Sequence, residues 1–245
     1  MRKSPLIVVG WICCLATVAH AGPLTLGVQA GSSIPNLRDK GGGDLSSGYS
    51  SRVAPFFGAY AEQSLGHEFS LRAEINYAAQ GGQREGMQPL QDTSQFPVPP
   101  GTALYADFKT VAKLDYLEIP ILARYHISAV PGLFVNGGPY MGFLLSAKTE
   151  TSGSSQVFLD PQGQQPTDGI TYPFEATTDN KSDLKTFNWG FQAGLGVTHE
   201  VGGGTASLEV RGGLGMTNIQ KDEANGKNAT GVLVIAAGYG WHLGS

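Results

Sequence analysis

The sequence predicts an all-β fold in which eight antiparallel strands close into a transmembrane barrel. Eight segments alternate apolar and polar residues with a period of two, and the connections between them alternate between short and long. Residues 114–127 show the alternation best, because Leu117 and Ile121 share an apolar face while Glu118 and Arg124 lie on the other. The apolar face extends over about eleven residues, the length that a tilted strand needs to cross a bilayer.

The chain begins with a segment that we interpret as a cleaved secretory signal peptide. Arg2 and Lys3 supply positive charge, a short apolar stretch follows, and Ala19-His20-Ala21 fits the small-x-small cleavage pattern. The apolar stretch is too short to span a membrane comfortably as a helix. We therefore predict two parts, a signal peptide at residues 1–21 and a single outer-membrane barrel domain at residues 22–245.

Each alternating segment has an apolar side that we expect to face lipid. The first four segments, with examples of their outward residues, are 24–30 (Leu24, Val28), 53–63 (Val53, Phe57), 69–79 (Leu71, Ile75) and 114–127 (Leu117, Ile121). The last four are 133–148 (Val135, Met141), 186–200 (Phe187, Leu195), 205–217 (Leu208, Val210) and 231–243 (Leu233, Ile235). Small or polar residues occupy most of the alternate positions, as in strands with one face in lipid and one in a lumen.

The connections sort into two classes, and this is the strongest indication of a barrel. Three are short, at residues 64–68, 128–132 and 201–204. Four are long and polar, and they span residues 31–52, 80–109, 149–185 and 218–230. Outer-membrane barrels have short periplasmic turns and long extracellular loops, so an even strand count places both termini in the periplasm. A soluble sandwich or lipocalin could alternate similarly, but it has no reason to sort its loops by length.

The four long connections are rich in Gly, Ser, Gln, Asp and Pro and poor in aliphatic residues. A segment of this composition buries too little apolar surface to fold alone. Two interpretations stay open at this point. The loops present a binding surface for an extracellular ligand, or they are solvated covers of the barrel mouth.

The predicted inward positions carry three arginines and four glutamates. They are Glu62, Arg72, Glu74, Glu118, Arg124, Glu209 and Arg211. Eight strands leave an interior that side chains can fill, and buried ions are tolerated when they are paired. We predict that these side chains form a structural charge network that plugs the lumen. The alternative is a gated ion path through a narrow channel.

Aromatic residues gather near both ends of the predicted strands. Tyr125, Tyr239 and Trp241 lie near the short-turn ends, and Tyr77 and Trp189 lie near the long-loop ends. Aromatic girdles of this kind occur at the two interfaces of a membrane. We favour this interpretation over a carbohydrate-binding platform.

No residue pattern indicates catalysis. A lipid A deacylase or a surface protease would need a histidine near the outer surface, with a serine or an acid beside it. The histidines after the predicted signal peptide all lie at predicted short-turn ends, and they are His67, His126, His199 and His242. They come from different hairpins and show no spacing typical of metal ligands. We predict that the protein is not an enzyme and has no catalytic, cofactor-binding or metal-binding residues.

The composition limits the partners as well. Both cysteines, Cys13 and Cys14, lie in the predicted signal peptide, so the mature chain would hold no disulfide and no thiolate metal site. The formal net charge is −4 at pH 7 and no basic run is present, which excludes nucleic acid as a partner. We expect a monomer that needs no cofactor and whose partners are outer-membrane lipids and the barrel-assembly machinery.

Residues 116–125, Tyr-Leu-Glu-Ile-Pro-Ile-Leu-Ala-Arg-Tyr, resemble the "YLEIPLLLKY"-like strand of the PorT-like outer-membrane β-barrel proteins. The resemblance implies an eight-stranded barrel in the outer membrane of a diderm bacterium and carries over no catalytic residues. The chain departs from the aromatic last residue of such barrels, because its last aromatic residue is Trp241. We predict a structural or surface-binding protein, with a narrow porin-like channel or transport accessory as the alternative and a barrel-borne hydrolase third.

Overall fold

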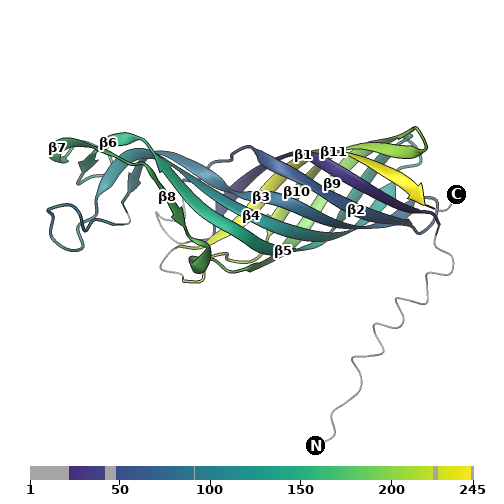
Figure 1. The fold of residues 1–245 in the computed structure, drawn as a ribbon, viewed down its shortest axis with the longest axis horizontal. Helices are drawn as coiled ribbons and strands as arrows, with labels where there is room; N and C mark the ends of the chain where they lie inside the picture. The colour runs from purple at the N-terminus through teal and green to yellow at the C-terminus, as the bar shows by residue number, and fades with distance from the viewer. Residues whose placement is uncertain (1–21, 42–47, 91, 223–225, 244–245) are drawn as a thin grey trace, which may run out of the picture.

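The computed structural model describes residues 22–41, 48–90, 92–222 and 226–243, and it consists almost entirely of β-sheet (Figure 1). The eight long strands are β1 (Leu24–Asp39), β2 (Ala54–Ser64), β3 (Phe69–Pro89), β4 (Tyr105–His126), β5 (Leu133–Ser152), β9 (Phe187–Val201), β10 (Gly204–Gly215) and β11 (Asn228–Leu243). No helix in the described part of the chain is long and apolar enough to cross a membrane. The predicted signal peptide, residues 1–21, lies outside the described residues.

Antiparallel hydrogen bonding joins each of these eight strands to two neighbours in a closed ring. β1 pairs with β2 on one side and with β11 on the other, and β5 closes the far side by pairing with β4 and β9. The first and last strands stay in register from Leu24 opposite Leu243 to Asp39 opposite Asn228. A ring has no unpaired edge, which is what a sheet within lipid requires. The predicted fold class, an eight-stranded antiparallel barrel, is confirmed.

The two faces of the strands are those that the alternation predicts. On β4, the Ile121 side chain is 38 % exposed on the outer surface, whereas Leu122 faces the lumen and is completely buried. On β3, Ile75 is exposed and the neighbouring Glu74 is buried. A shift of the register by one residue would have inverted both pairs, because the side-chain period of a strand is two.

The three predicted short connections are turns at one end of the barrel, called here the short-turn end. Residues 65–68 join β2 to β3, residues 127–132 join β4 to β5, and Gly202 with Gly203 joins β9 to β10. Both glycines have positive φ angles, 60° and 81°, as the central residues of a type I′ hairpin turn require. The start of β1 and the end of β11 lie at this same end (Figure 1).

The long connections differ from the prediction, because strands extend into all four of them. β3 continues through residues 80–89 and β4 already begins at Tyr105, so most of the predicted loop at 80–109 is a paired hairpin. β1, β5 and β11 are also longer than predicted at this end, which is called here the long-loop end. Glycine and polar residues replace the alternating apolar face in these extensions. Pairing with a neighbouring strand holds them, and the periodicity of a single segment cannot reveal that pairing.

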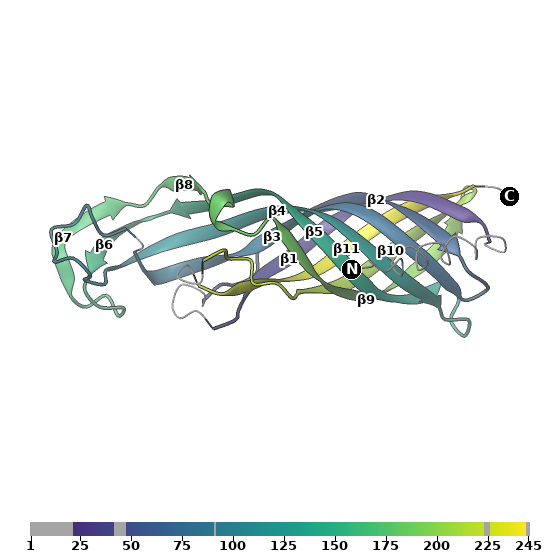
Figure 2. The same ribbon diagram turned by 90° about the horizontal axis from the view of Figure 1, so that it is seen from below.

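Short strands add to the extended side of the barrel and form a distal sheet that projects beyond the ring (Figures 1 and 2). They are β6 (Ser154–Phe158), β7 (Pro166–Pro173) and β8 (Ala176–Asp179), followed by the 3₁₀ helix η3 (Lys181–Asp183). β6 pairs with the start of β4, β7 pairs with β6, and β8 pairs with the end of β5. Phe96, Leu104 and Val157 pack together as a small apolar core. The connection at 149–185 therefore folds by adding strands to the barrel, and it is not merely a solvated cover.

Candidate functional site

The inward charges meet in one layer of the lumen. Six of the seven are 5 % exposed or less; apart from Glu118, they are Arg72, Glu74, Arg124, Glu209 and Arg211. β3 carries the first two, β4 carries the third and β10 carries the last two. In the ring, β3 and β10 lie opposite each other. A contact between these two strands therefore crosses the lumen.

Arg211 makes that crossing contact. Its Nη1 and Nη2 donate to Glu74 Oε2 and Oε1 at 2.8 and 2.9 Å. Its Nε donates to Glu209 Oε1 at 2.6 Å. The two-pronged contact with Glu74 is the geometry in which a guanidinium binds a carboxylate most strongly. The pair joins the two sides of the barrel across its interior.

Two further arginines complete the network. Arg124 contacts Glu62 Oε2 at 3.0 Å and Glu209 Oε2 at 3.4 Å. Arg72 Nε contacts Glu74 Oε1 at 2.7 Å. Arg72 Nη1 also lies 3.6 Å from Glu62 Oε2, so Glu62, Glu74 and Glu209 each have two guanidinium partners. Buried ion pairs require this degree of compensation.

Neutral side chains fill the space around the guanidinium groups. Arg72 lies over the Tyr60 ring at 3.4 Å from the centroid, and Arg124 lies over Phe134 at 3.9 Å. Arg72 Nη2 also donates to Gln29 Oε1 at 2.7 Å. A guanidinium between an aromatic face and a carboxylate is held on more than one side, so the lumen at this depth is filled by fixed side chains.

Glu118 stands apart from the arginines, although the sequence groups it with them. The side chain is 2 % exposed and accepts hydrogen bonds from Gln80 Nε2 at 2.7 Å and from Gln192 Nε2 at 2.9 Å. Among the described residues, no basic side chain lies within 4.0 Å of its carboxylate. The expected cationic partner is replaced by two amides from β3 and β9.

An apolar layer separates the charge network from the long-loop end. Its main side chains are Leu37, Leu114, Tyr116, Leu144, Leu184 and Ile219. They come from strands on several sides of the barrel, from the segment between η3 and β9 and from the segment before β11. An apolar constriction opposes the passage of ions, so this layer closes the lumen a second time.

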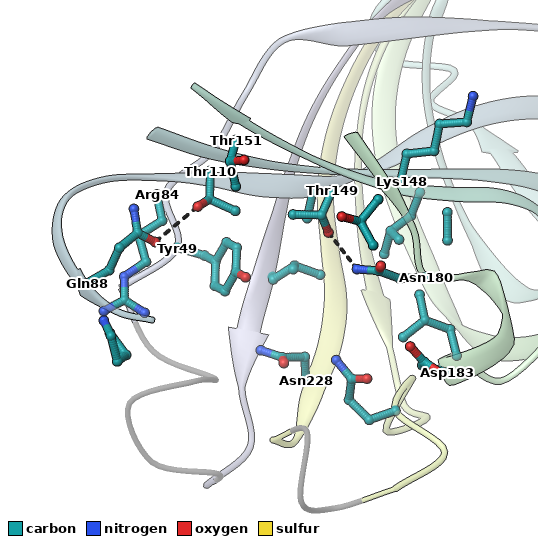
Figure 3. A pocket seen from close by; sticks show the side chains of 18 of the residues that line it. Tyr49, Arg84, Gln88, Thr110, Lys148, Thr149, Thr151, Asn180, Asp183 and Asn228 are labelled. Carbon is teal, nitrogen blue, oxygen red and sulfur yellow. Dashed lines mark hydrogen bonds between the residues drawn. The ribbon is translucent and has the colours of Figure 1, made fainter. Parts of the chain in front are cut away.

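A cavity of about 520 Å³ lies above the apolar layer, at the long-loop end (Figure 3). This volume is within the range of small-molecule sites. Leu114 and Ile219 belong both to the apolar layer and to the cavity lining. The upper parts of β3, β4 and β5 form one wall. Residues of β1, β8, η3 and β11 and of the connections between strands also line the cavity.

The polar part of the cavity lining is mostly uncharged. Threonines, asparagines and glutamines dominate, and Thr110 donates to Gln88 while Asn180 donates to Thr149, at 3.1 and 2.8 Å (Figure 3). Burial raises the pKa of the Tyr49 hydroxyl above its usual range, so this group meets the cavity as a neutral donor. The lining suits a polar ligand without a large net charge.

The five predicted interfacial aromatics lie on the outer surface in two groups. Tyr125, Tyr239 and Trp241 are at the short-turn end, while Tyr77 and Trp189 are nearer the long-loop end. Several of them contact a second aromatic ring, for example Tyr239 with Trp241 at 5.2 Å between centroids.

In the described part of the chain, no three histidine, cysteine, aspartate or glutamate side chains form a group that could hold a metal ion. His126 lies 3.8 Å from Glu62, and His242 lies 3.2 Å from Glu200. Both contacts are near the short-turn end.

Sequence reasoning missed the cavity and the amides of the lumen. Gln29, Gln80 and Gln192 all occupy inward positions next to charged residues. The position of these glutamines on the polar face of alternating segments could have indicated that their side chains point into the lumen. The cavity left no such signal, because its walls come from strand extensions that show no periodicity.

We expect the intact protein to show little or no conductance in a planar lipid bilayer. The Arg211–Glu74 contact crosses the lumen, and the apolar layer closes it again. The measurement is single-channel recording after reconstitution, with a known porin as the positive control. A large and steady conductance would mean that the lumen is open and would favour the channel alternative.

Comparison with known proteins places these features in a family. No curated protein matches the chain. One similar solved structure is that of Ail, the attachment invasion locus protein of Yersinia pestis, in complex with the heparin analogue sucrose octasulfate. The sequence identity is 11 % and the TM-score is 0.38, and the match covers 90 % of this chain and 100 % of Ail. Neisserial surface protein A (NspA) is similar with 10 % identity and a TM-score of 0.37, and the match covers 89 % of this chain and 97 % of NspA.

The outer membrane protein AlkL, studied in lipid bilayers, is similar with 13 % identity and a TM-score of 0.34, over 91 % of this chain and 92 % of that one. The family model described as "Outer membrane protein beta-barrel domain" matches residues 19–221, which is most of the chain. The closed ring of eight strands agrees with that match. The chain therefore belongs to the outer membrane protein beta-barrel domain family.

Proposed function

We propose that this protein is a non-enzymatic outer-membrane barrel that binds an extracellular ligand at its long-loop end. The observation that carries the proposal is the cavity of about 520 Å³ above a lumen filled by paired charges. A cavity closed at its base can hold a ligand but gives it no way through. Its lining combines an apolar floor with neutral hydrogen-bonding groups, which is the usual composition of a small-molecule site.

The orientation that fits this function puts the long-loop end outside the cell. We propose that residues 1–21 are removed on export and that residues 22–245 form a single domain, which the barrel-assembly machinery inserts as a monomer with both termini in the periplasm. Short turns on the periplasmic side are the rule for such barrels. The PorT-like resemblance of residues 116–125 supports the same arrangement.

The test is a binding assay on cells that display the protein, using labelled panels of oligosaccharides and other small polar molecules without a large net charge. Thr178→Trp places a large side chain in the cavity lining from the exposed strand β8. Thr171→Trp is the matched control, because Thr171 is exposed on β7 and does not line the cavity. We expect the first change to reduce binding at least tenfold, about 1.4 kcal/mol, and the second to leave it unchanged. Equal binding by both variants would place the ligand elsewhere.

The orientation predicts which insertions antibodies can reach on intact cells. An epitope tag next to Gly163, in the turn between β6 and β7, should be labelled. A tag between Gly202 and Gly203, in the shortest turn, should be labelled only after the outer membrane is permeabilised. Labelling of the second tag on intact cells would reverse the proposed topology.

A further inference from the structure

The inward residues of β4 form a ladder along one wall of the cavity at the long-loop end. Leu114, Ala112, Thr110 and Phe108 all line the cavity, and they follow one another at every second position. Residues two apart on one face of a strand are separated by roughly 7 Å. The four side chains therefore lie at successive depths of the cavity, from its floor at Leu114 to its rim at Phe108.

The facing strand β5 repeats this order of polarity. Its residues Ala147, Thr149 and Thr151 also line the cavity. The cross-strand pairs, from the floor upward, are Leu114 with Ala147, Ala112 with Thr149, and Thr110 with Thr151. Both strands thus change from aliphatic side chains at the floor to hydroxyl groups above it.

The floor of the cavity is closed by further apolar side chains. Leu37, Leu184 and Ile219 reach it from other sides of the barrel, and each of them is 7 % exposed or less. These side chains offer no hydrogen bond to a ligand. A polar group placed on them would lose its water without replacement, which costs free energy. The floor therefore favours an apolar end of a ligand.

Uncharged hydrogen-bonding groups surround the cavity above this floor. Thr110 and Gln88 lie on one side, and Thr149 and Asn180 lie on the other (Figure 3). Hydroxyl and amide groups both donate and accept hydrogen bonds, which matches the hydroxyl groups of a sugar or another polyol. The charged side chains of the lining are two bases and two acids, so they add no net charge that would favour a charged ligand.

We propose that the cavity binds an uncharged amphiphile, with a short apolar chain on the floor and a hydroxyl-bearing head among the threonines and amides. The inference rests on the proposed function, because it names the class of ligand that the same cavity would bind. A purely polar ligand would desolvate its groups against the floor, and a pure hydrocarbon would leave the hydrogen-bonding groups above the floor without partners. The order of side chains also orients the ligand, with its head toward the long-loop end.

The experiment measures equilibrium binding of methyl, propyl and pentyl glucosides to the full barrel in phosphatidylcholine vesicles, with empty vesicles as the blank. Each methylene group that packs on the floor should lower the dissociation constant about fourfold, equivalent to about 0.8 kcal/mol. Pentyl sulfate and pentyltrimethylammonium carry the same chain on a charged head, and they should bind at least tenfold more weakly than pentyl glucoside. Equal dissociation constants for the three glucosides, or no binding by any of them, would overturn the proposal.

Two variants assign the two ends of the ligand. Ala112→Leu places a larger side chain just above the floor and should abolish the gain in affinity from methyl to pentyl glucoside. Thr110→Val replaces a wall hydroxyl by a methyl group, and it should weaken binding of all three glucosides about two- to tenfold while keeping that gain. Val111→Leu is the matched control, because Val111 is the neighbour on β4 that does not line the cavity, and it should change neither. A gain that survives Ala112→Leu unchanged would overturn the proposal as well.

The failure of this inference can be distinguished from failure of the proposed function. Thr178→Trp could weaken the binding of a polar ligand from the panel while the glucosides show no dependence on chain length. The cavity would then bind a ligand that is not an amphiphile, and only this inference would fail. If Thr178→Trp changes the binding of neither the panel nor the glucosides, the proposed function fails together with it.

Discussion

Replacement of Arg211 by alanine should lower the free energy of unfolding by about 3–5 kcal/mol. Arg211 donates two hydrogen bonds to Glu74 across the lumen and one to Glu209 on its own strand. Its removal leaves both carboxylates short of a partner in a region where neither is more than 5 % exposed. Urea unfolding in lipid vesicles, read by fluorescence and by heat-modifiable gel mobility, measures the change.

A double replacement separates the pair from the general effect of mutation. Glu74→Gln combined with Arg211→Met removes the acid and the base together. The combined change should lower the free energy of unfolding by less than the sum of the two single changes. Each single change leaves one member of the pair without its partner, whereas the double change removes both members. Lys148→Ala is the control for loss of a positive charge at the exposed cavity rim, and it should change stability by no more than about 0.5 kcal/mol. Strict additivity of the two lumen changes would show that Arg211 and Glu74 are not coupled.

Replacement of Ile121 by arginine should lower the free energy of unfolding by about 2–4 kcal/mol, the value for a charge on the lipid face near the bilayer midplane. Ile121 lies midway along β4 between Tyr125 and Leu117, and Leu117 pairs with Tyr77 of the second aromatic group. The residue therefore sits between the two aromatic groups, at the depth where a charge is least tolerated. Folding into vesicles, followed by gel mobility, gives the measurement.

The same substitution in a turn provides the matched control. Leu65→Arg adds an arginine in the connection between β2 and β3, where Leu65 is already exposed, and it should cost about 0–1 kcal/mol. Leu122→Gln changes the inward neighbour of Ile121 and should cost less than Ile121→Arg, because the lumen already holds polar partners. Similar losses for Ile121→Arg and Leu65→Arg would mean that β4 does not face lipid at Ile121.

The barrel itself could be predicted from sequence because its information is local. Lipid on one side and a polar lumen on the other impose a period of two on each strand, as Ile75 and Glu74 show. The turns were predictable as well, because the adjacent glycines Gly202 and Gly203 are typical of a tight hairpin turn. Both signals lie within a single segment or its immediate neighbours.

The strand extensions and the cavity could not be predicted because their information is shared between distant segments. Residues 80–89 form a strand because they pair with β4, and nothing in their own alternation requires it. The partner of Glu118 was unpredictable for the same reason. Its amides, Gln80 and Gln192, come from β3 and β9, and only the register of the closed ring brings them to one carboxylate.

The paired extension of β3 and β4 makes the distal sheet a platform of defined height. Each residue adds about 3.3 Å along a strand, and its side chain points to the face opposite that of its neighbour. Lengthening both strands by a single residue would turn the packing of Phe96, Leu104 and Val157 to the wrong side. Lengthening both by two residues would preserve it and move the platform roughly 7 Å along the strands. Insertion of residues in pairs therefore changes the height of the distal sheet without changing which side chains face its apolar core.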